Sequence, residues 1–366
     1  MSLTDSMIPF CKTPLVGGER EAVERVIWTG RLAQGPEVEA FEEEVREVLG
    51  CEHAIAVSSG TAAIHIAMII LKRKIHELLV PIFNFQAIEN VGKREKIPVS
   101  YLDVHPETLQ QSYFSLPCNL GSKIMPMYLG GSVPEFPKFP ENILLEDACH
   151  AFGARYPDGS LVGSGRIAPV SVFSFHPSKT ITTGEGGMLT TNDPEFARQA
   201  RMYRDHGRDY RNDPHHFRYA GLNYRMTELG AAVGRVQLRA LPAILEDRRN
   251  SVGSYRARLE QSCGDFLTVQ KQDVERSACH LMIVIFNAQV ARPKVKRIAS
   301  ILEREGVSTR IHYPPLDPEA LDYLEGAREV VGKFLSLPLY YGMLEEEIER
   351  VVETLRKAIQ ESEGKK

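Results

Sequence analysis

The chain has 366 residues, 43% of them hydrophobic and 25% charged, which are ordinary values for a globular protein with room for about two domains. Its formal net charge of −4 at pH 7 provides no basic field, which argues against nucleic acid as a partner. The first residues lack the pattern of a secretion signal, and no run reaches the roughly 18 apolar residues of a membrane span. We therefore expect a soluble, cytoplasmic protein with no membrane partner.

Cysteine usage excludes two further classes of protein. The six cysteines are scattered and contain no CxxC pair, so the sequence predicts neither a disulfide framework nor a metal site. Free thiols in the core are the expected alternative. The cysteines are Cys11, Cys51, Cys118, Cys149, Cys263 and Cys279.

In chain order, the first predicted helix covers residues 35–50, with a proline near its start and a glycine at its end. Its apolar face is formed by Val38, Phe41, Val45, Val48 and Leu49. A buried strand follows from residue 54, and after a Ser-Gly turn a helix begins near Thr61. Further strands are predicted within the segments 97–104, 122–129, 141–153 and 169–175. Strands that alternate with helices imply a mostly parallel sheet covered on both faces.

The second half of the chain is more helical. Two helical patterns cover residues 225–241 and 242–260, where Pro242 fits the first turn of a second helix or a kink in one long helix. A strand at 280–286 follows, then a helix at 292–306. A terminal helix is also predicted, and its inward face is formed by Ile348, Val351, Val352, Leu355 and Ile359. We expect a large domain over residues 1–242 and a smaller α+β domain over residues 243–366.

Ligands of such a sheet bind where strands end and helices begin, so residues at the strand ends are the first functional candidates. Asp147 follows an apolar strand, where its carboxylate can cap a turn or pair with a buried cationic ring nitrogen. Lys179 lies in FHPSKTITTGEGG (175–187), where an ordinary surface lysine is the alternative. The SSGT segment (58–61) offers hydroxyl and N–H groups to an anion, although similar residues begin many helices.

Several common readings of a lysine in a glycine-rich stretch do not fit. In a P-loop the lysine follows the glycines, whereas Lys179 precedes them, and no GxGxxG turn is present at 184–187. His150 and His176 have no partner at the spacing of a metal site. The aldehyde cofactor pyridoxal phosphate (PLP) requires a lysine, an opposing carboxylate, an anion cradle and usually an aromatic ring. The chain offers all four in separate strand-end segments.

With these motifs in order, the sequence resembles the DegT/StrS-type family of PLP enzymes, chiefly nucleotide-sugar aminotransferases. The resemblance covers nearly the whole chain. It is carried by GRLAQGPEVEAFE, SSGTAAIHIA, EDACHAFGA, FSFHPSKTITTGEGGMLTTND, LNYRMTELGAA, STRIHYPPL and LSLPLY. It implies the fold type I architecture, in which a mostly parallel seven-stranded sheet is sandwiched by helices. It also implies a homodimer with its active sites at the subunit interface.

The resemblance also assigns cofactor positions. It implies that Lys179 is the Schiff-base lysine, that Asp147 faces the pyridine nitrogen, and that His150 contacts the ring near the phenolic oxygen. The remaining implied contacts are Gly60, Thr61 and Ser174 at the phosphate, Phe85 stacked on the ring, and Asn223, which reaches the phosphate from the neighbouring subunit.

Substrate positions are predicted with explicit alternatives. Thr182, Thr183 and Glu185 either line the substrate side or make the glycine-rich turn itself. The resemblance places His312 and Tyr313 toward the amino donor or sugar, whereas packing at the domain junction is the alternative. Two arginines, Arg225 and Arg310, could pair with a donor carboxylate or a nucleotide phosphate, or could make structural salt bridges. Ile88 and Glu89 replace small hydroxyl residues that are common in the family.

The predicted activity is transfer of an amino group from an amino acid, by default glutamate, to a keto sugar through PLP and its amine form (PMP), with ping-pong kinetics. A PLP- or PMP-dependent sugar dehydratase of the same family is one alternative, although Lys179 argues against it, since those members carry histidine at that position. A noncatalytic PLP-binding regulator is another. A fold type I enzyme acting on amino acids by decarboxylation or elimination is a third.

Overall fold

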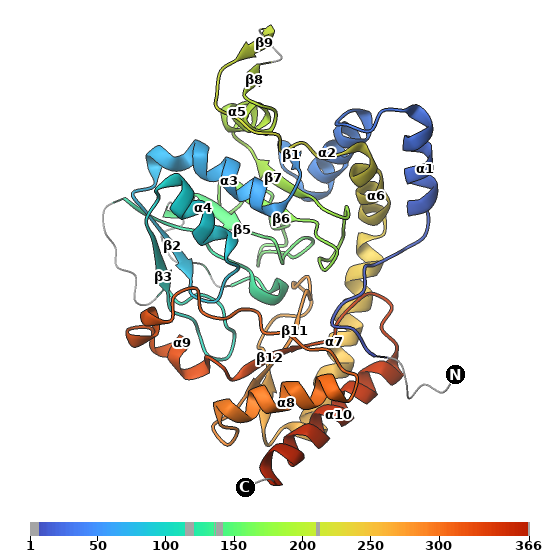
Figure 1. The fold of residues 1–366 in the computed structure, drawn as a ribbon, viewed down its shortest axis with the longest axis vertical. Coiled ribbons are helices and arrows are strands. Elements are labelled where there is room, and N and C mark those ends of the chain that lie inside the picture. The colour runs from blue at the N-terminus through green and yellow to red at the C-terminus, as the bar shows by residue number, and fades with distance from the viewer. Residues whose placement is uncertain (1–6, 114–120, 135, 137–141, 210–212, 365–366) are drawn as a thin grey trace.

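The computed structural model describes residues 7–113, 121–134, 136, 142–209 and 213–364 (Figure 1). The helices are α1 (Glu19–Thr29), α2 (Pro36–Leu49), α3 (Gly60–Leu71), α4 (Ala87–Glu95), α5 (Pro194–Arg204), α6 (Glu228–Arg239), α7 (Leu241–Cys263), α8 (Arg292–Arg304), α9 (Glu325–Val330) and α10 (Glu345–Gly364). The strands are β1 (His53–Val57), β2 (Glu77–Pro81), β3 (Val99–Leu102), β4 (Ser122–Ile124), β5 (Leu145–Asp147), β6 (Val170–Ser174), β7 (Gly187–Thr191), β8 (Arg208–Asp209), β9 (Asp213–Phe217), β10 (Leu267–Val269), β11 (Met282–Phe286) and β12 (Phe334–Leu337).

The central sheet consists of a three-stranded part in the order β3-β2-β4 and a four-stranded part in the order β1-β7-β6-β5. Parallel bridges from Ile124 to Ile143 and from Met127 to Asp147 join the two parts into the seven strands expected. Strand β7 runs antiparallel to both β1 and β6, while the pairs β2–β3, β2–β4 and β5–β6 are parallel. The prediction of a mostly parallel sheet is therefore confirmed.

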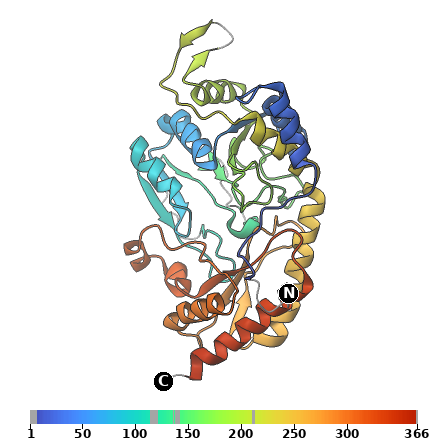
Figure 2. The same ribbon diagram turned by 45° about the vertical axis from the view of Figure 1, so that its right-hand side comes forward.

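Alternate residues of the buried strands supply two different cores. Ile55 and Val57 of β1 belong to a hydrophobic cluster with α3 and α4, whereas Ala54 and Ala56 face a second cluster with α2, α6 and α7. This period of two is the pleat of a strand with helices on both of its faces. Figure 2 shows the helical layers on either side of the sheet.

Helix α2 shows how the sequence pattern becomes packing. Val38, Phe41 and Val45 are fully buried, and Gly50 ends the helix in the left-handed conformation with φ of 70°. The prediction for Val48 was wrong, because its side chain is 39% exposed. The buried stripe is narrower than the apolar positions alone indicated.

The amino end of α2 is held by a distant carboxylate. Glu228, at the start of α6 and 3% exposed, accepts hydrogen bonds from the backbone N–H groups of Gly35, Glu37 and Val38 at 2.8, 2.9 and 2.9 Å. No side chain of α2 itself caps this end. The negative charge satisfies orphan donors and opposes the positive end of the helix dipole.

We predict that Glu228→Gln lowers the free energy of unfolding by about 2 kcal/mol, because one charge-assisted acceptor is replaced by an NH₂ group that faces backbone donors. Urea unfolding followed by circular dichroism measures this loss. Glu39→Gln, an exposed change in the first turn of the same helix, is the matched control and should leave the transition within about 0.5 kcal/mol. Equal transitions for both variants would contradict the assignment.

The lower part of the molecule is a smaller α+β unit built on the antiparallel sheet β10-β11-β12. Its core draws on α7, α8 and α10, and includes Ile8 from the opposite end of the chain. Pro242 lies in the first turn of α7, which begins directly after α6 ends, so the second-helix alternative is confirmed. The predicted inward face of α10 is also confirmed. Its buried members are Ile348, Val351, Val352, Leu355 and Ile359.

Three further features bear on function. The hairpin β8–β9 stands away from the rest of the chain at the top of Figure 1. Within the described ranges, no helix combines the length and hydropathy needed to cross a bilayer. Five described cysteines are free thiols: Cys51, Cys263 and Cys279 are buried, whereas Cys11 and Cys149 are partly exposed. Cys118 lies outside the described residues.

Candidate functional site

Asp147 is the last residue of β5, where its backbone N–H donates to Pro126 O at 2.9 Å. Its side chain is 3% exposed, and one carboxylate oxygen accepts the N–H of Cys149 at 3.1 Å. Burial raises the pKa of Asp147, while the hydrogen bonds from Cys149 and the charge of Lys179 act in the opposite direction. A buried carboxylate of this kind favours a cationic ligand group beside it.

The preceding acid on the same strand is enclosed by protein. Glu146 has no exposed surface, and its carboxylate accepts hydrogen bonds from the hydroxyls of Tyr128, Tyr156 and Ser171. Because side chains alternate along a strand, Glu146 and Asp147 point to opposite faces. Glu146 is therefore a structural anchor of β5, and Asp147 is the carboxylate that a ligand can reach.

Lys179 lies in the turn between β6 and β7. Its backbone N–H donates to His176 O at 2.8 Å, and the turn closes where Thr182 Oγ1 and Thr183 N both donate to Phe175 O. Desolvation lowers the pKa of Lys179, and the neighbouring Cys149 and Asp147 oppose that shift. The lysine amine and the Asp147 carboxylate thus act on each other electrostatically, as the predicted site requires.

A close approach of backbone and small side chains lies at the start of α3. A Cβ added to Gly60 would lie 2.8 Å from Ser174 Cβ and 3.4 Å from Cys149 Sγ, so glycine is required at this contact. Ser59 caps α3 by accepting the Ala62 N–H at 3.1 Å, and Thr61 is exposed in the first turn. A Cβ on Gly187 of β7 would meet Ser59 O at 2.4 Å. The helix amino end therefore lies against the ends of β6 and β7.

His150 and Tyr313 join this site from opposite halves of the chain. His150 is 2% exposed, and its Nε2 lies 2.9 Å from the Tyr313 hydroxyl. The ring of Tyr313 lies 5.8 Å from that of Phe85, whose side chain is 56% exposed. Burial raises the pKa of Tyr313, and so does the carboxylate of Asp147, so the phenol stays protonated. The structure brings together the predicted ring-facing residues.

His280 was missed by the sequence analysis. Its ring packs 4.3 Å from that of His150, and it is 4% exposed with its Nδ1 unpartnered. Its only sequence signal is its place immediately before the apolar strand β11. His312 also lies close by, stacked on Phe10 at 5.1 Å with its Nδ1 3.0 Å from Ser336 Oγ.

The other predicted substrate residues have different surroundings. Arg225 forms an ion pair with Asp205, as its salt-bridge alternative states, and Asn223 is exposed next to it. Glu185 is exposed at the tip of the turn. The hydroxyls of Thr182 and Thr183 bond to backbone oxygens of that turn. Arg310 is exposed, with its guanidinium donating to Ser308 Oγ and Thr309 O.

The unusual residues after Phe85 face the interior. Ile88 has no exposed surface, and Glu89 is 6% exposed. The Glu89 carboxylate accepts from Gln86 Nε2 at 2.5 Å, from Lys93 Nζ at 2.9 Å and from the Tyr101 hydroxyl. Both residues therefore take part in the packing of α4, and Glu89 links it to Tyr101 of β3.

We predict acid sensitivity from the partly buried His312. Burial and the charges of Lys179 and Arg310 lower the pKa of His312 to about 4, whereas an unfolded histidine titrates near 6.5. Between these values the unfolded chain binds a proton that the folded chain refuses, so this group lowers stability as pH falls from about 6.5 to 4. His312→Asn keeps a partner for Ser336 and removes the titration.

Urea midpoints at pH 7.5 and 5.0 measure this effect as the difference between the variant and the unaltered protein. The variant should gain stability relative to the unaltered protein at the lower pH. A difference that is the same at both pH values would contradict the assignment.

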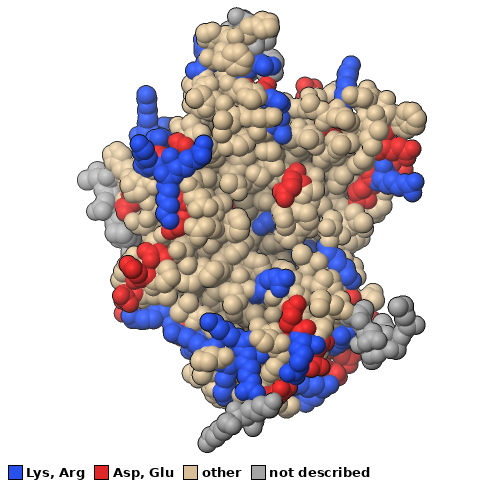
Figure 3. All heavy atoms as spheres, viewed as in Figure 1, with Lys and Arg blue, Asp and Glu red and all other residues tan. Residues whose placement is uncertain are grey.

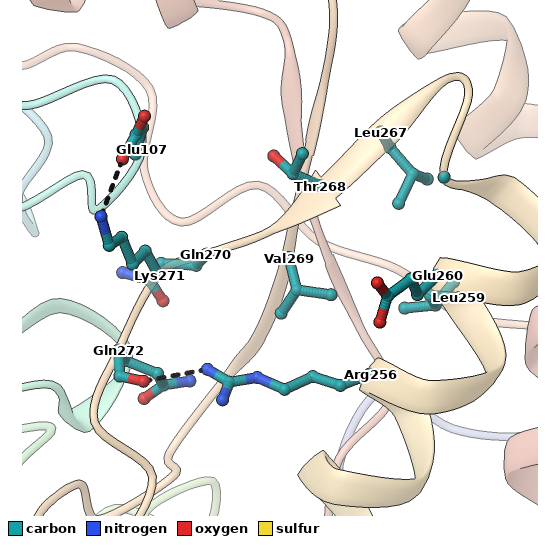
Figure 4. Close-up of a pocket in the computed structure, with 11 residues that line it drawn as sticks. Glu107, Arg256, Leu259, Glu260, Leu267, Thr268, Val269, Gln270, Lys271 and Gln272 are labelled. Atoms are coloured by element: carbon teal, nitrogen blue, oxygen red, sulfur yellow. Dashed lines mark hydrogen bonds and ion pairs between the residues drawn. The ribbon is translucent and has the colours of Figure 1, made fainter.

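A separate hollow of about 590 Å³ lies between α7 and β10 (Figure 4). Its lysine and one of its acids form an ion pair, Lys271 to Glu107 at 3.3 Å, and Arg256 donates to Gln272 O at 3.1 Å. None of the predicted site residues lines it. The hollow is therefore separate from the predicted cofactor site.

Several known proteins are similar to this chain in sequence or in fold. GDP-perosamine synthase of Caulobacter vibrioides is 31% identical over 361 residues, which cover 93% of this chain and 95% of that protein. The structure of Helicobacter pylori PseC, an aminotransferase of pseudoaminic acid biosynthesis, has a TM-score of 0.86 and 23% identity, covering 97% and 100% of the two chains. The structure of Bacillus subtilis NtdA with bound PMP has a TM-score of 0.83 and 24% sequence identity, and the match covers 97% of this chain and 86% of that one.

These structural likenesses confirm the expected fold type I architecture. A family model matches residues 16–356, which include every candidate residue of the site. The chain therefore belongs to the DegT/DnrJ/EryC1/StrS aminotransferase family.

Proposed function

We propose that this protein is a PLP-dependent aminotransferase that moves an amino group from an amino acid, by default glutamate, to a nucleotide-linked keto sugar. The observation that carries the proposal is the arrangement of a buried carboxylate, Asp147, and a desolvated amine, Lys179, beside the close contact of Gly60 with Ser174. The names of GDP-perosamine synthase and PseC support a sugar substrate.

The residues present fit PLP. Gly60 leaves room for backbone N–H groups at the amino end of α3 to meet a phosphate, and Thr61 and Ser174 add hydroxyls. Phe85 is exposed and free to cover a planar ring. Asp147 provides a negative charge in a site shielded from water, where a pyridinium nitrogen would satisfy it. Lys179 provides the amine that an aldehyde needs.

When bound, PLP supplies an electron sink for a carbon that loses a proton next to nitrogen. Asp147 would hold a proton on the ring nitrogen, which preserves that sink. The lowered pKa of Lys179 increases its unprotonated fraction, so its Nζ would serve as the amine for the aldehyde and as the base that moves a proton. His312 and Tyr313 border the same space and are proposed to contact the amino donor or the sugar.

Arg225 and Glu185 are weaker proposals for substrate contact. Arg225 is 28% exposed despite its ion pair with Asp205, so its guanidinium retains donors for a carboxylate or phosphate. Glu185 is exposed in the same turn between β6 and β7 that carries Lys179. We also propose the division into domains at residue 242, since one hydrophobic cluster is built almost entirely from residues after it.

The function is tested in two half-reactions. The PLP form is mixed with glutamate alone, and one equivalent of 2-oxoglutarate per site is expected. A panel of nucleotide-linked keto sugars is then screened for return of the PLP spectrum. Release of 2-oxoglutarate without reaction of any sugar would contradict the sugar substrate. Failure of the first half-reaction would overturn glutamate as the amino donor.

We further propose a homodimer with the active site at the subunit interface. Asn223 is exposed, as a residue that serves a neighbouring site must be, and Leu222 and Phe217 nearby are 44% and 53% exposed. Much of the surface between the projecting hairpin and the centre of Figure 3 carries few charged side chains. Such a surface is typical of an interface between subunits.

We predict a mass near twice 41.0 kDa by light scattering at assay concentrations. Asn223→Asp places a negative charge where the partner's phosphate is expected, so PLP affinity should fall about tenfold or more. Glu39→Gln is the control. A fully active monomer would overturn the interface assignment.

A further inference from the structure

A turn with two adjacent glycines packs against His150 and forms a hydrogen bond with its ring. Residues Leu129–Gly131 form a short 3₁₀ turn in which Gly130 and Gly131 have φ of 74° and 89°. The N–H of Gly130 donates to His150 Nδ1 at 3.4 Å, while its carbonyl accepts the N–H of His280 at 2.8 Å. A Cβ on Gly131 would lie 2.9 Å from His150 O and 3.0 Å from His280 N. The turn therefore fixes both imidazole-bearing segments.

The partners of His150 determine which of its nitrogens carries the proton. A backbone N–H can only donate, so Nδ1 must act as an acceptor and carry no proton. Burial and the nearby charge of Lys179 lower the pKa of His150 well below its usual range, so the ring is neutral. A neutral ring with a bare Nδ1 holds its proton on Nε2, which then donates to the Tyr313 hydroxyl at 2.9 Å.

Tyr313 consequently accepts from His150 and keeps its own proton for another acceptor. Within the residues that the structure describes, no group accepts that proton. The segment carrying Tyr313 is held by the bridge from Phe83 to Pro315 and by the Leu316 N–H, which donates to Ile82 O at 3.0 Å. The ring of Tyr313 lies 5.8 Å from that of Phe85, and the carboxylate of Asp147 acts on its phenol electrostatically.

His280 closes the remaining side of this arrangement. Its ring packs on His150 with the planes inclined by 50°. Its carbonyl accepts from the buried guanidinium of Arg248 at 2.8 Å, which fixes the backbone behind the ring. His150 is thereby enclosed by His280, Tyr313 and the glycine turn, and cannot rotate to offer its Nε2 proton elsewhere without losing both hydrogen bonds.

We propose that Tyr313 donates a hydrogen bond to an anionic oxygen of the ligand in this site, and that His150 is a positioning residue that orients the phenol. The proposal rests on the proposed function, because the acceptor is either the phenolate oxygen of PLP or a carboxylate of the amino donor. It differs from the role that the family resemblance implies for His150. In either case the contact with the ligand is made by Tyr313, and His150 acts through it.

The first test reads the tautomer directly and needs neither cofactor nor turnover. Protein labelled with ¹⁵N-histidine is studied by NMR, and the His150 signals are identified by their loss in His150→Gln. We expect the pattern of a neutral ring with its proton on Nε2 at pH 7.5. A proton on Nδ1, or a charged ring, would overturn the orientation of Tyr313 whether or not PLP binds.

The second test locates the acceptor. A donor lowers the proton affinity of an anionic oxygen, so Tyr313→Phe should raise the pH midpoint of the visible absorbance of bound PLP by about one unit if the acceptor is the cofactor. If the acceptor is the amino donor, the midpoint stays and the Kd for glutamate rises about tenfold instead. No change in either quantity would overturn the proposal.

Matched variants separate positioning from packing. His150→Gln retains an acceptor toward Gly130 and a donor toward Tyr313, so the affected quantity should stay within about twofold or 0.3 pH units of the unaltered protein. His150→Leu removes both the acceptor and the donor, so it should change the same quantity as Tyr313→Phe by a similar amount. Equal behaviour of the glutamine and leucine variants would contradict the positioning role. Absence of a visible band in the unaltered protein would instead count against the proposed function.

Discussion

Lys179→Ala is expected to abolish both the visible absorbance of protein-bound PLP and all aminotransferase activity. Burial lowers the pKa of this side chain, and the Asp147 carboxylate acts on it electrostatically. Alanine leaves no nucleophile for the aldehyde and no base to move the carbon-bound proton. We expect activity to fall by at least about 10⁴-fold.

The measurement combines spectra with the glutamate half-reaction. Borohydride treatment of the unaltered protein should make the cofactor inseparable from the chain, and a tryptic peptide carrying Lys179 should bear its mass. Lys271→Ala, which removes an exposed lysine of the lower domain, is the control. A retained visible band in Lys179→Ala, or a modified peptide from another segment, would show that a different amine carries the chemistry.

Asp147→Asn is expected to reduce kcat by about 10²–10³-fold while leaving the protein folded. The change is nearly isosteric, and it keeps an oxygen for the Cys149 N–H while removing the charge that we propose holds a proton on the ring nitrogen of PLP. Burial raises the pKa of Asp147, so its ionised form is costly. The neutral amide should therefore give equal or higher thermal stability.

Opposite movements of activity and Tm identify a residue selected for chemistry at a cost in stability. Steady-state kinetics and differential scanning calorimetry supply the two quantities. Asp158→Asn, an exposed acid paired with Arg166, serves as the control and should change kcat less than twofold. If Asp147→Asn lost both activity and stability, its carboxylate would be the turn cap that the sequence also allowed.

The strand-end residues could be placed from the sequence because a local pattern determines them. An apolar run that ends in Glu-Asp predicts β5 and brings Asp147 to the edge of the sheet, and a Ser-Gly pair before a long apolar stretch predicts the start of α3. The same holds for the turn that carries Lys179. These features depend on short-range sequence order, which a single sequence displays.

Long-range partners could not be predicted in this way. Nothing near Glu228 indicates that it binds the amino end of a helix almost 200 residues earlier, and nothing near Arg225 identifies Asp205 as its ion-pair partner. His280 precedes an apolar strand and resembles a core residue until the fold places it on His150. The prediction that Val48 lies on the buried face was also wrong, since helical periodicity gives the direction of a face but not its width.

The adjacent acids of β5 have a consequence for insertions and deletions in this segment. The pleat assigns Glu146 to a sealed compartment of three hydroxyls and Asp147 to the ligand side. A register slip of one residue would exchange them: a glutamate, one methylene longer, would enter the catalytic space, and an aspartate would fall short of its tyrosines. The register of β5 is consequently as constrained as the two residue types themselves.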